Sequence, residues 1–192
     1  MIKAIIFDCF GVLSTEGWEP FYQKHFGDKP VLLEQARDLI RQLNKGSLSY
    51  DSFIPKVTKL AGVPRSEFLA QFHENVPNQP LFNYIKNVLK PKYKIGLLSN
   101  AGANWLDKIF TPEQLGLIDE YVLSYSVKFI KPQPEIYDII TKKLGVKDNQ
   151  CVMVDDRQKQ VDGAKELGLK AILYQDFEQM KDELGKILAT DS

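Results

Sequence analysis

The sequence contains few of the residues that build disulfides or zinc sites. Only two cysteines and two histidines occur among its 192 residues. Cys9 and Cys151 fall at or beside predicted core strands, where a small buried side chain is expected rather than a disulfide. Neither histidine lies near the strand ends considered below, so the pattern does not favour zinc.

An excess of charge and long apolar runs are also absent. Lys+Arg and Asp+Glu number 25 each, so the formal net charge is zero, which gives no footprint for nucleic acid or an anionic membrane. No run reaches the roughly eighteen apolar residues of a transmembrane helix, and the first apolar segment is too short for a signal peptide. We therefore expect a soluble cytoplasmic protein with neither a nucleic-acid nor a membrane partner.

The first apolar segment ends in an aspartate. Residues 3–13 read KAIIFDCFGVL, and so dense an apolar run is typical of a strand buried on both faces of a parallel sheet. Asp8 then lies at the carboxyl end of the strand, where open α/β sheets place their ligand crevice. The alternative is that Asp8 merely caps a turn, so its meaning depends on what the rest of the chain places beside it.

The pattern after Leu13 is helical as far as about residue 90. We predict helices over about 18–26, 31–45, 50–61, 65–74 and 79–90, with Ser49 as an N-cap and Gly46 closing the second helix. These residues are too many for one crossover helix and too few for an independent α/β domain. We expect a helical insertion over the carboxyl edge of the sheet, where it would exclude water from a site.

Strands and helices alternate from Tyr93 onward. Strands are predicted over 93–99, 121–125, 151–154 and 171–174, with helices over about 103–110, 134–144 and 158–167 and a last helix at the end. Thr111-Pro112-Glu113-Gln114 has the pattern of a capping box with proline at the first helical position. This alternation predicts an α/β fold with parallel strands joined by right-handed crossovers.

Polar residues follow each later strand at its carboxyl end. The second strand ends in Ser99-Asn100, Lys131 follows the third, and Asp155-Asp156 end the fourth. Because parallel strands share one carboxyl edge, these side chains are expected to meet Asp8. Three carboxylates repel one another unless a cation lies between them, and hard oxygen ligands favour Mg²⁺.

The remaining polar groups suit an anionic substrate. Ser99, Asn100 and Lys131 supply a hydroxyl, an amide and a positive charge, as phosphate oxygens require. With Mg²⁺ to balance charge, Asp8 could attack phosphorus in line, and aspartyl-phosphate is established chemistry for a carboxylate nucleophile. Each element is common by itself, and their ordered delivery by successive strands makes the pattern specific.

These segments resemble the motifs of the haloacid dehalogenase-like hydrolase superfamily. FDCFGVL is similar to the first motif, LLSN to the second, KPQPEIY to the third and VDDRQKQVDGAKELGL to the fourth with its helix. The resemblance implies a Rossmannoid three-layer parallel sheet of residues 1–13 and 86–192 with a small helical cap of residues 14–85. It is strongest to sugar-phosphate phosphatases and the N-terminal phosphatase domain of soluble epoxide hydrolases.

The resemblance also implies roles for individual residues. Asp8 would be the nucleophile and a metal ligand, and Asp156 the main further ligand, with Asp155 at the metal or directly behind it. The backbone carbonyl of Phe10 would complete the ligands for Mg²⁺. Such a site would act on a small phosphorylated metabolite.

The phosphate-binding roles in this family fall on the second and third motifs. Ser99 and Lys131 would bind the phosphoryl group, and Lys131 would also offset the charge of the carboxylates. Asn100 would orient the loop or contact the substrate.

One position departs from the phosphatase pattern. Family phosphatases carry a second aspartate two residues after the nucleophile, as general acid for the leaving group, and here that position is Phe10. General acid catalysis contributes about 10²–10⁴-fold, so turnover of esters with poor leaving groups is expected to be slow. Acyl and aryl phosphates would suffer least.

Two alternatives remain open at this point. Haloacid dehalogenases, which work without metal, have an aromatic residue at the position of Phe10, but they replace the paired acids that this chain retains as Asp155 and Asp156. A catalytically weak module that binds a phosphorylated ligand or a protein would also retain the phosphate site without the acid. The phosphatase is the interpretation that the motifs favour most.

Overall fold

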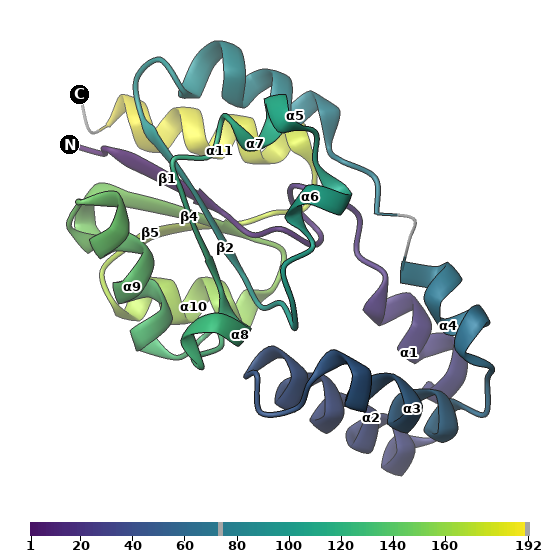
Figure 1. Ribbon diagram of the computed structural model, residues 1–192. Helices are drawn as coiled ribbons and strands as arrows, with labels where there is room; N and C mark the ends of the chain where they lie inside the picture. Colours follow the sequence, from purple (N-terminus) through teal and green to yellow (C-terminus); the bar gives the residue numbers. More distant parts are fainter. Residues whose placement is uncertain (73–74, 191–192) are drawn as a thin grey trace.

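Five parallel strands form one sheet in the computed structural model, which describes residues 1–72 and 75–190. In the order β3-β2-β1-β4-β5 they are Glu120–Leu123, Lys94–Ser99, Ala4–Phe7, Cys151–Asp155 and Lys170–Leu173. The first strand of the chain therefore lies at the centre of the sheet (Figure 1). The predicted α/β fold with a parallel sheet is confirmed.

Helices cover both faces of the sheet. One face is covered by α5 (Gln79–Tyr84), the π-helix η1 (Ile85–Leu89) and α11 (Phe177–Ala189), and the other by α9 (Pro134–Leu144) and α10 (Gln158–Glu166) (Figure 1). In β1, Ile5 and Phe7 pack into the first hydrophobic cluster and Ala4 and Ile6 into the second. All four side chains are fully buried, which explains the unbroken apolar run.

Short elements connect these layers. They are α6 (Leu106–Ile109), α7 (Pro112–Leu115), α8 (Ser124–Val127) and the 3₁₀ turn η2 (Asp148–Gln150). The predicted capping box is present, since the Thr111 side chain accepts from the backbone of Gln114 and the Gln114 side chain from that of Thr111. The helix predicted over 103–110 is shorter than expected. The strand predicted over 121–125 ends at Leu123, where α8 begins.

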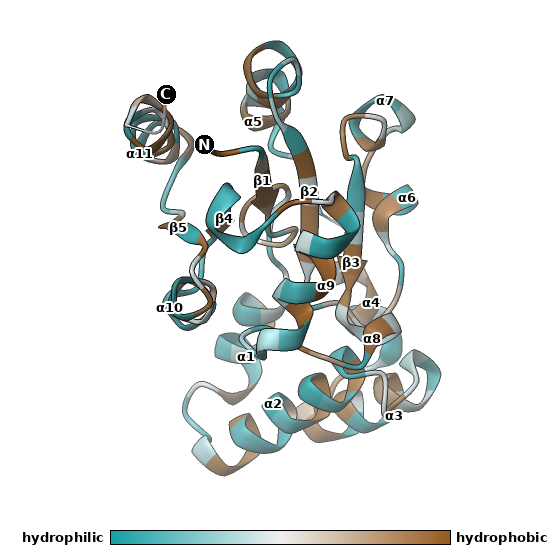
Figure 2. Cartoon of the chain, turned by 90° about the vertical axis from the view of Figure 1, so that its left-hand side faces the viewer, coloured by the Kyte–Doolittle hydropathy of each residue, from teal (hydrophilic) through white to brown (hydrophobic). Residues whose placement is uncertain are grey.

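Four helices form a separate cluster beside the carboxyl edge of the sheet. They are α1 (Trp18–Phe26), α2 (Pro30–Asn44), α3 (Tyr50–Ala61) and α4 (Arg65–Phe72), and α2 and α3 alternate polar and apolar positions along their length (Figure 2). Their buried residues, among them Phe21, Phe53 and Phe68, form a hydrophobic cluster distinct from those of the sheet. Residues 73–74, at the end of the helix predicted over 65–74, lie outside the described residues, and His73 with them.

The division into a core of residues 1–13 and 86–192 and a cap of residues 14–85 stays a prediction. The packing adds one fact to it. Helix α5 falls inside the predicted cap range, but its Leu81 and Phe82 belong to the hydrophobic cluster of the sheet. The insertion over the carboxyl edge is thus formed by α1–α4, while α5 returns the chain to the sheet.

Two further predictions concern single features. Cys9 and Cys151 are both buried and free, as expected for small core residues. Within residues 1–72 and 75–190, no helix has the length and apolar character needed to span a membrane.

The close approach of α10 to the loop after Lys131 gives a prediction about stability. A Cβ added at Gly163 would lie 2.5 Å from Pro132 Cβ and 3.2 Å from its carbonyl oxygen. We expect Gly163→Ala to destabilise the fold by about 1–2 kcal/mol in urea unfolding, because overpacking outweighs the gain in helix propensity.

Gly185→Ala is the matched control in α11. An added Cβ meets nothing within 4 Å there, so alanine should stabilise by about 0.5–1 kcal/mol. Equal stabilisation by both substitutions would show that the contact between α10 and Pro132 is not tightly constrained.

Candidate active site

The carboxyl ends of β1 and β4 place two aspartates side by side. Phe7 pairs with Val154 in the parallel register, so Asp8 and Asp155 stand level as the next residues of their strands. Both carboxylates are buried, and Asp8 Oδ1 accepts a 2.7 Å hydrogen bond from the Cys9 backbone N–H. The expected meeting of these side chains at one edge therefore follows from the register.

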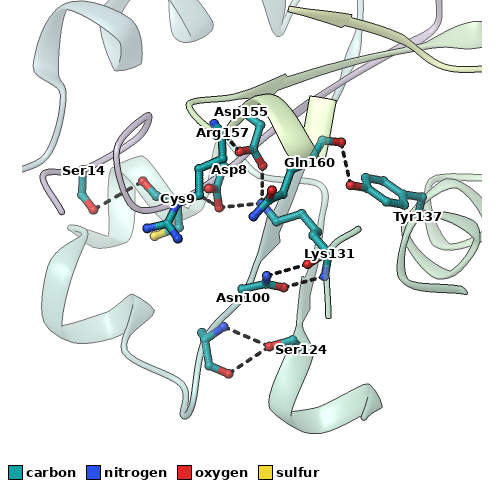
Figure 3. Close-up of polar contacts among 11 residues, drawn as sticks. Asp8, Cys9, Ser14, Asn100, Ser124, Lys131, Tyr137, Asp155, Arg157 and Gln160 are labelled. Carbon is teal, nitrogen blue, oxygen red and sulfur yellow. Dashed lines mark hydrogen bonds and ion pairs between the residues drawn. The ribbon is translucent and has the colours of Figure 1, made fainter. Parts of the chain in front are cut away.

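Lys131 joins the two aspartates. Its ammonium lies 2.9 Å from Asp8 Oδ1 and 2.5 Å from Asp155 Oδ2, and its side chain is 1% exposed (Figure 3). A buried charge is stable only when it is paired and hydrogen-bonded. Lys131 pairs with both carboxylates, and each carboxylate pairs with Lys131.

A second hydrogen-bonded pair fixes the backbone of Lys131. Asn100 Oδ1 accepts from the Lys131 N–H at 2.8 Å, and Asn100 Nδ2 donates to the Lys131 carbonyl at 3.1 Å (Figure 3). The amide that follows β2 thus holds the loop that carries the lysine. Of the two roles implied for Asn100, loop orientation is the one that these bonds support.

The third carboxylate leaves the cluster with an excess of negative charge. Oxygens of Asp8, Asp155 and Asp156 all lie within 4.8 Å of one another, against the single ammonium of Lys131. Gly11 lies against Asp156, because a Cβ added at Gly11 would stand 2.3 Å from Asp156 Oδ2. A divalent cation would balance this charge, and three carboxylates are the hard oxygen donors that Mg²⁺ takes.

The pKa values of these groups reflect the same imbalance. Burial raises the pKa of Asp8 to about 7, Lys131 opposes this rise, and the charges of Asp155 and Asp156 add to it. Burial and the neighbouring Asp155 likewise raise the pKa of Asp156. Burial by itself would lower the pKa of Lys131, but the two carboxylates that it contacts outweigh burial and raise it, so the lysine stays charged.

Two buried oxygens have no hydrogen-bond partner within the described part of the chain. They are Ser99 Oγ and Asp156 Oδ1. Phe7 pairs with Leu97, so Ser99 stands level with Cys9, one residue beyond Asp8. A buried polar atom without a partner costs free energy, and a bound anion at Ser99 and a cation at Asp156 would each remove that cost.

The cap supplies the facing side of the site. An open cavity, here called the carboxylate cavity, is lined by Asp8, Phe10, Lys131 and Arg157 from the core and by Glu16 and Trp18 from the cap side, among others. Arg157 Nη2 lies 3.3 Å from Glu16 Oε2. Trp18 also packs edge-on against Phe53 at 5.3 Å, so it contributes to the cap cluster and to the cavity wall together.

Sequence reasoning placed some of these residues and missed others. Arg157 follows Asp155 and Asp156 directly in the chain, yet its side chain pairs with Glu16, and its backbone N–H donates to Asp155. Ser124 belongs to none of the motifs, yet its hydroxyl donates to the Asn44 carbonyl of α2 at 2.6 Å and joins cap to core. No pattern in one sequence marks such a long-range contact.

Comparisons with known proteins agree with this geometry. A family model described as haloacid dehalogenase-like hydrolase matches residues 2–168. The D-ribitol-5-phosphate phosphatase of Bacteroides thetaiotaomicron is 28% identical over 98% of this chain and 99% of its own length. The mouse bifunctional epoxide hydrolase 2 is 24% identical over 88% of this chain, which spans 32% of that protein.

A solved structure extends the likeness to three dimensions. It is a wild-type HAD family enzyme from Bacteroides thetaiotaomicron in complex with magnesium and inorganic phosphate. The two share 25% identity with a TM-score of 0.71, over 94% of this chain and 99% of the other.

Removal of the buried ammonium tests the electrostatics of the site. Lys131→Met would leave Asp8 and Asp155 buried without their cation, and we expect a loss of about 3–5 kcal/mol in urea unfolding at pH 8. Lys143→Met, which removes an exposed ion pair with Glu120 at 3.2 Å, is the control and should cost less than about 1 kcal/mol.

The deficit of Lys131→Met should also shrink as the pH falls from 8 to 5. Without the ammonium the pKa of Asp8 in the folded state rises further above its ordinary value. A carboxyl group with a raised pKa binds more protons when folded than when unfolded, so stability is lost as the pH rises through that pKa. A deficit independent of pH would contradict this account.

Proposed function

This chain belongs to the haloacid dehalogenase-like hydrolase family, and from that premise we propose that it is a Mg²⁺-dependent phosphatase acting on a small phosphorylated metabolite. The family expected from the four motifs is confirmed. The observation that carries the proposal is the set of three convergent carboxylates around one buried ammonium. Beside them, at the end of the neighbouring strand β2, Ser99 Oγ has no hydrogen-bond partner within the described residues.

The relatives support a phosphorylated substrate. One relative over nearly the whole chain is named for the hydrolysis of D-ribitol 5-phosphate, and the similar solved enzyme was crystallised with magnesium and inorganic phosphate. The donor set of this chain suits the same two ligands, with carboxylate oxygens for the cation and an ammonium and a hydroxyl for phosphate.

The proposed mechanism uses Asp8 as nucleophile. Its free carboxylate oxygen attacks phosphorus, a phosphorus–oxygen bond to Asp8 forms, and the ester bond breaks with its electron pair leaving on the alcohol oxygen. Water then attacks the aspartyl-phosphate, which releases inorganic phosphate and restores the carboxylate. Bound Mg²⁺, held by Asp8, Asp156, the Phe10 carbonyl and Asp155 directly or from behind, would neutralise charge on the phosphoryl oxygens.

The other residues would position the phosphoryl group. Lys131 would neutralise developing charge, since its ammonium already lies beside the oxygen of Asp8. Ser99 would donate its hydroxyl to a phosphoryl oxygen, and Asn100 would keep the Lys131 loop in place through its two backbone hydrogen bonds.

Phe10 sets the character of this phosphatase. It stands where family phosphatases carry their general acid, and its side chain lines the carboxylate cavity. The leaving oxygen would have no carboxylic acid from this position to protonate it. We therefore expect a phosphatase that favours leaving groups of low pKa.

The first test is metal-dependent turnover. With Mg²⁺ the protein should hydrolyse p-nitrophenyl phosphate, and chelation should abolish the activity. Asp8→Asn should lower kcat at least about a thousandfold because it removes the nucleophile. Asp107→Asn, at an exposed position of α6, is the control and should leave kcat unchanged.

The same protein distinguishes the rival functions. Halide release from 2-haloacids without metal would replace the phosphatase by a dehalogenase. Binding of inorganic phosphate with no turnover of any kind would indicate a non-catalytic module. A rise in Tm on Mg²⁺ addition that is lost in Asp156→Asn would support the metal site independently of activity.

Restoring the acid tests the role of Phe10. We expect Phe10→Asp to raise kcat for an alkyl phosphate such as ribitol 5-phosphate by about tenfold or more, while acetyl phosphate gains little. Phe10→Asn is the matched control, because it introduces the same size and polarity without a proton to donate. Equal gains in both variants would exclude general acid catalysis as the cause.

A further inference from the structure

A second cavity lies next to the carboxylate cavity, between the cap and the core. We name it the aromatic cavity, after the four aromatic side chains in its wall: Phe10, Trp18, Tyr50 and Trp105. Its volume is about 80 Å³, several times the space that one water molecule needs. Phe10, Trp18, Asn44 and Asn100 line both cavities, so the two are adjacent.

The cap closes against the core beside this cavity. Ser124 Oγ donates to the Asn44 carbonyl at 2.6 Å, and a Cβ added at Gly102 would lie 2.3 Å from Leu43 Cγ. Leu43, Asn44 and Gly102 are themselves part of the cavity wall. The wall therefore contains residues of both the cap and the core. A group that enters the aromatic cavity from the carboxylate cavity would be enclosed by α2 and the loop after β2.

Aromatic rings from the two layers meet in the wall. Tyr50, the first residue of α3, lies edge-on to Trp105 of the loop after β2, with ring centroids 4.8 Å apart at 67°. Lys108 Nζ lies 5.0 Å from the centroid of Trp105. A wall built from aromatic side chains favours a flat, apolar or aromatic ligand, and the amide of Asn44 in the same wall would meet a polar substituent of that ligand.

The groups around the leaving-group position offer little acid. Among the described residues, 1–72 and 75–190, none of those that line the aromatic cavity has a carboxyl or imidazole group. Outside the Asp8 cluster, the carboxylates that line the carboxylate cavity are each ion-paired with an arginine: Glu16 with Arg157, Glu19 with Arg37 and Glu34 with Arg41. A phenol, with a pKa near 10 like that of tyrosine, leaves far more readily than an aliphatic alcohol under these conditions.

We infer that the aromatic cavity holds the leaving group of the substrate, and that the substrates of this enzyme are aryl phosphates, phosphate esters of a flat aromatic hydroxyl. This inference rests on the phosphatase function proposed above and names its substrate class. The aryl oxygen leaves phosphorus with the bonding electron pair and takes its proton from water, while the phosphoryl group passes to Asp8 and then to water.

Four phosphates separate the ring from the leaving group. Phenyl phosphate has both an aromatic ring and an acidic alcohol, benzyl phosphate only the ring, acetyl phosphate only the good leaving group, and ribitol 5-phosphate neither. The highest kcat/KM is expected for phenyl phosphate among the three esters. Benzyl phosphate should share its low KM but turn over more slowly.

Substitutions in the wall test the cavity itself. Trp105→Ala should raise KM for phenyl phosphate about tenfold, the effect of one lost aromatic contact, and leave acetyl phosphate unchanged. Tyr121→Ala, at an exposed aromatic of β3 outside both cavities, is the control and should change neither. Inhibition by phenylphosphonate should exceed that by methylphosphonate in the wild type, and the difference should shrink in Trp105→Ala.

The outcomes separate this inference from the proposed function. Turnover of ribitol 5-phosphate as efficient as that of phenyl phosphate overturns the inference and leaves the phosphatase intact, as does an equal effect of Trp105→Ala on all four compounds. No metal-dependent turnover even of acetyl phosphate overturns the phosphatase. In that case binding of the two phosphonates tests the cavity separately. If phenylphosphonate binds no more tightly than methylphosphonate, the aromatic cavity is not a ligand site.

Discussion

The buried ammonium of Lys131 is the interaction on which the rest of the site depends. Among the residues that the structure describes, it is the only cation that forms ion pairs with both Asp8 and Asp155, and without it two buried carboxylates would face each other. Its position in turn depends on Asn100, which binds both polar groups of its backbone. The net charge that remains, with Asp156 added, explains why the cluster has the chemistry of a divalent cation site.

Parallel register brings these residues together from distant parts of the chain. Asp8 and Asp155 are level because β1 and β4 pair in parallel. Ser99 lies on the other side of Asp8, because its strand β2 pairs with the opposite edge of β1. The cap faces the same edge, and Arg157 and Glu16 connect the two across the cavity. The proposed catalytic groups thus lie at the carboxyl edge of the sheet, whereas the contacts proposed to select a substrate lie between the sheet and the cap.

Much of this could be predicted because the signals are local. The apolar run of β1, the capping box at Thr111 and the N-cap at Ser49 each depend on residues within a few positions, and each is present in the structure. The convergence of the acidic and basic residues that follow successive strands could also be predicted from the sequence. In a parallel sheet the carboxyl ends of all strands lie at the same edge. The roles given to Asp8, Ser99, Lys131, Asp155 and Asp156 remain proposals that the geometry supports.

The sequence by itself determined the fold class, the family motifs and the exceptional residue Phe10, because these depend on spacing and residue type. Only the tertiary structure decided that Trp105 meets Tyr50 from the cap at a second cavity. It also decided that Arg157 pairs with Glu16. Contacts between residues 55 or 141 positions apart depend on how two separately packed layers dock, and no short-range preference encodes that.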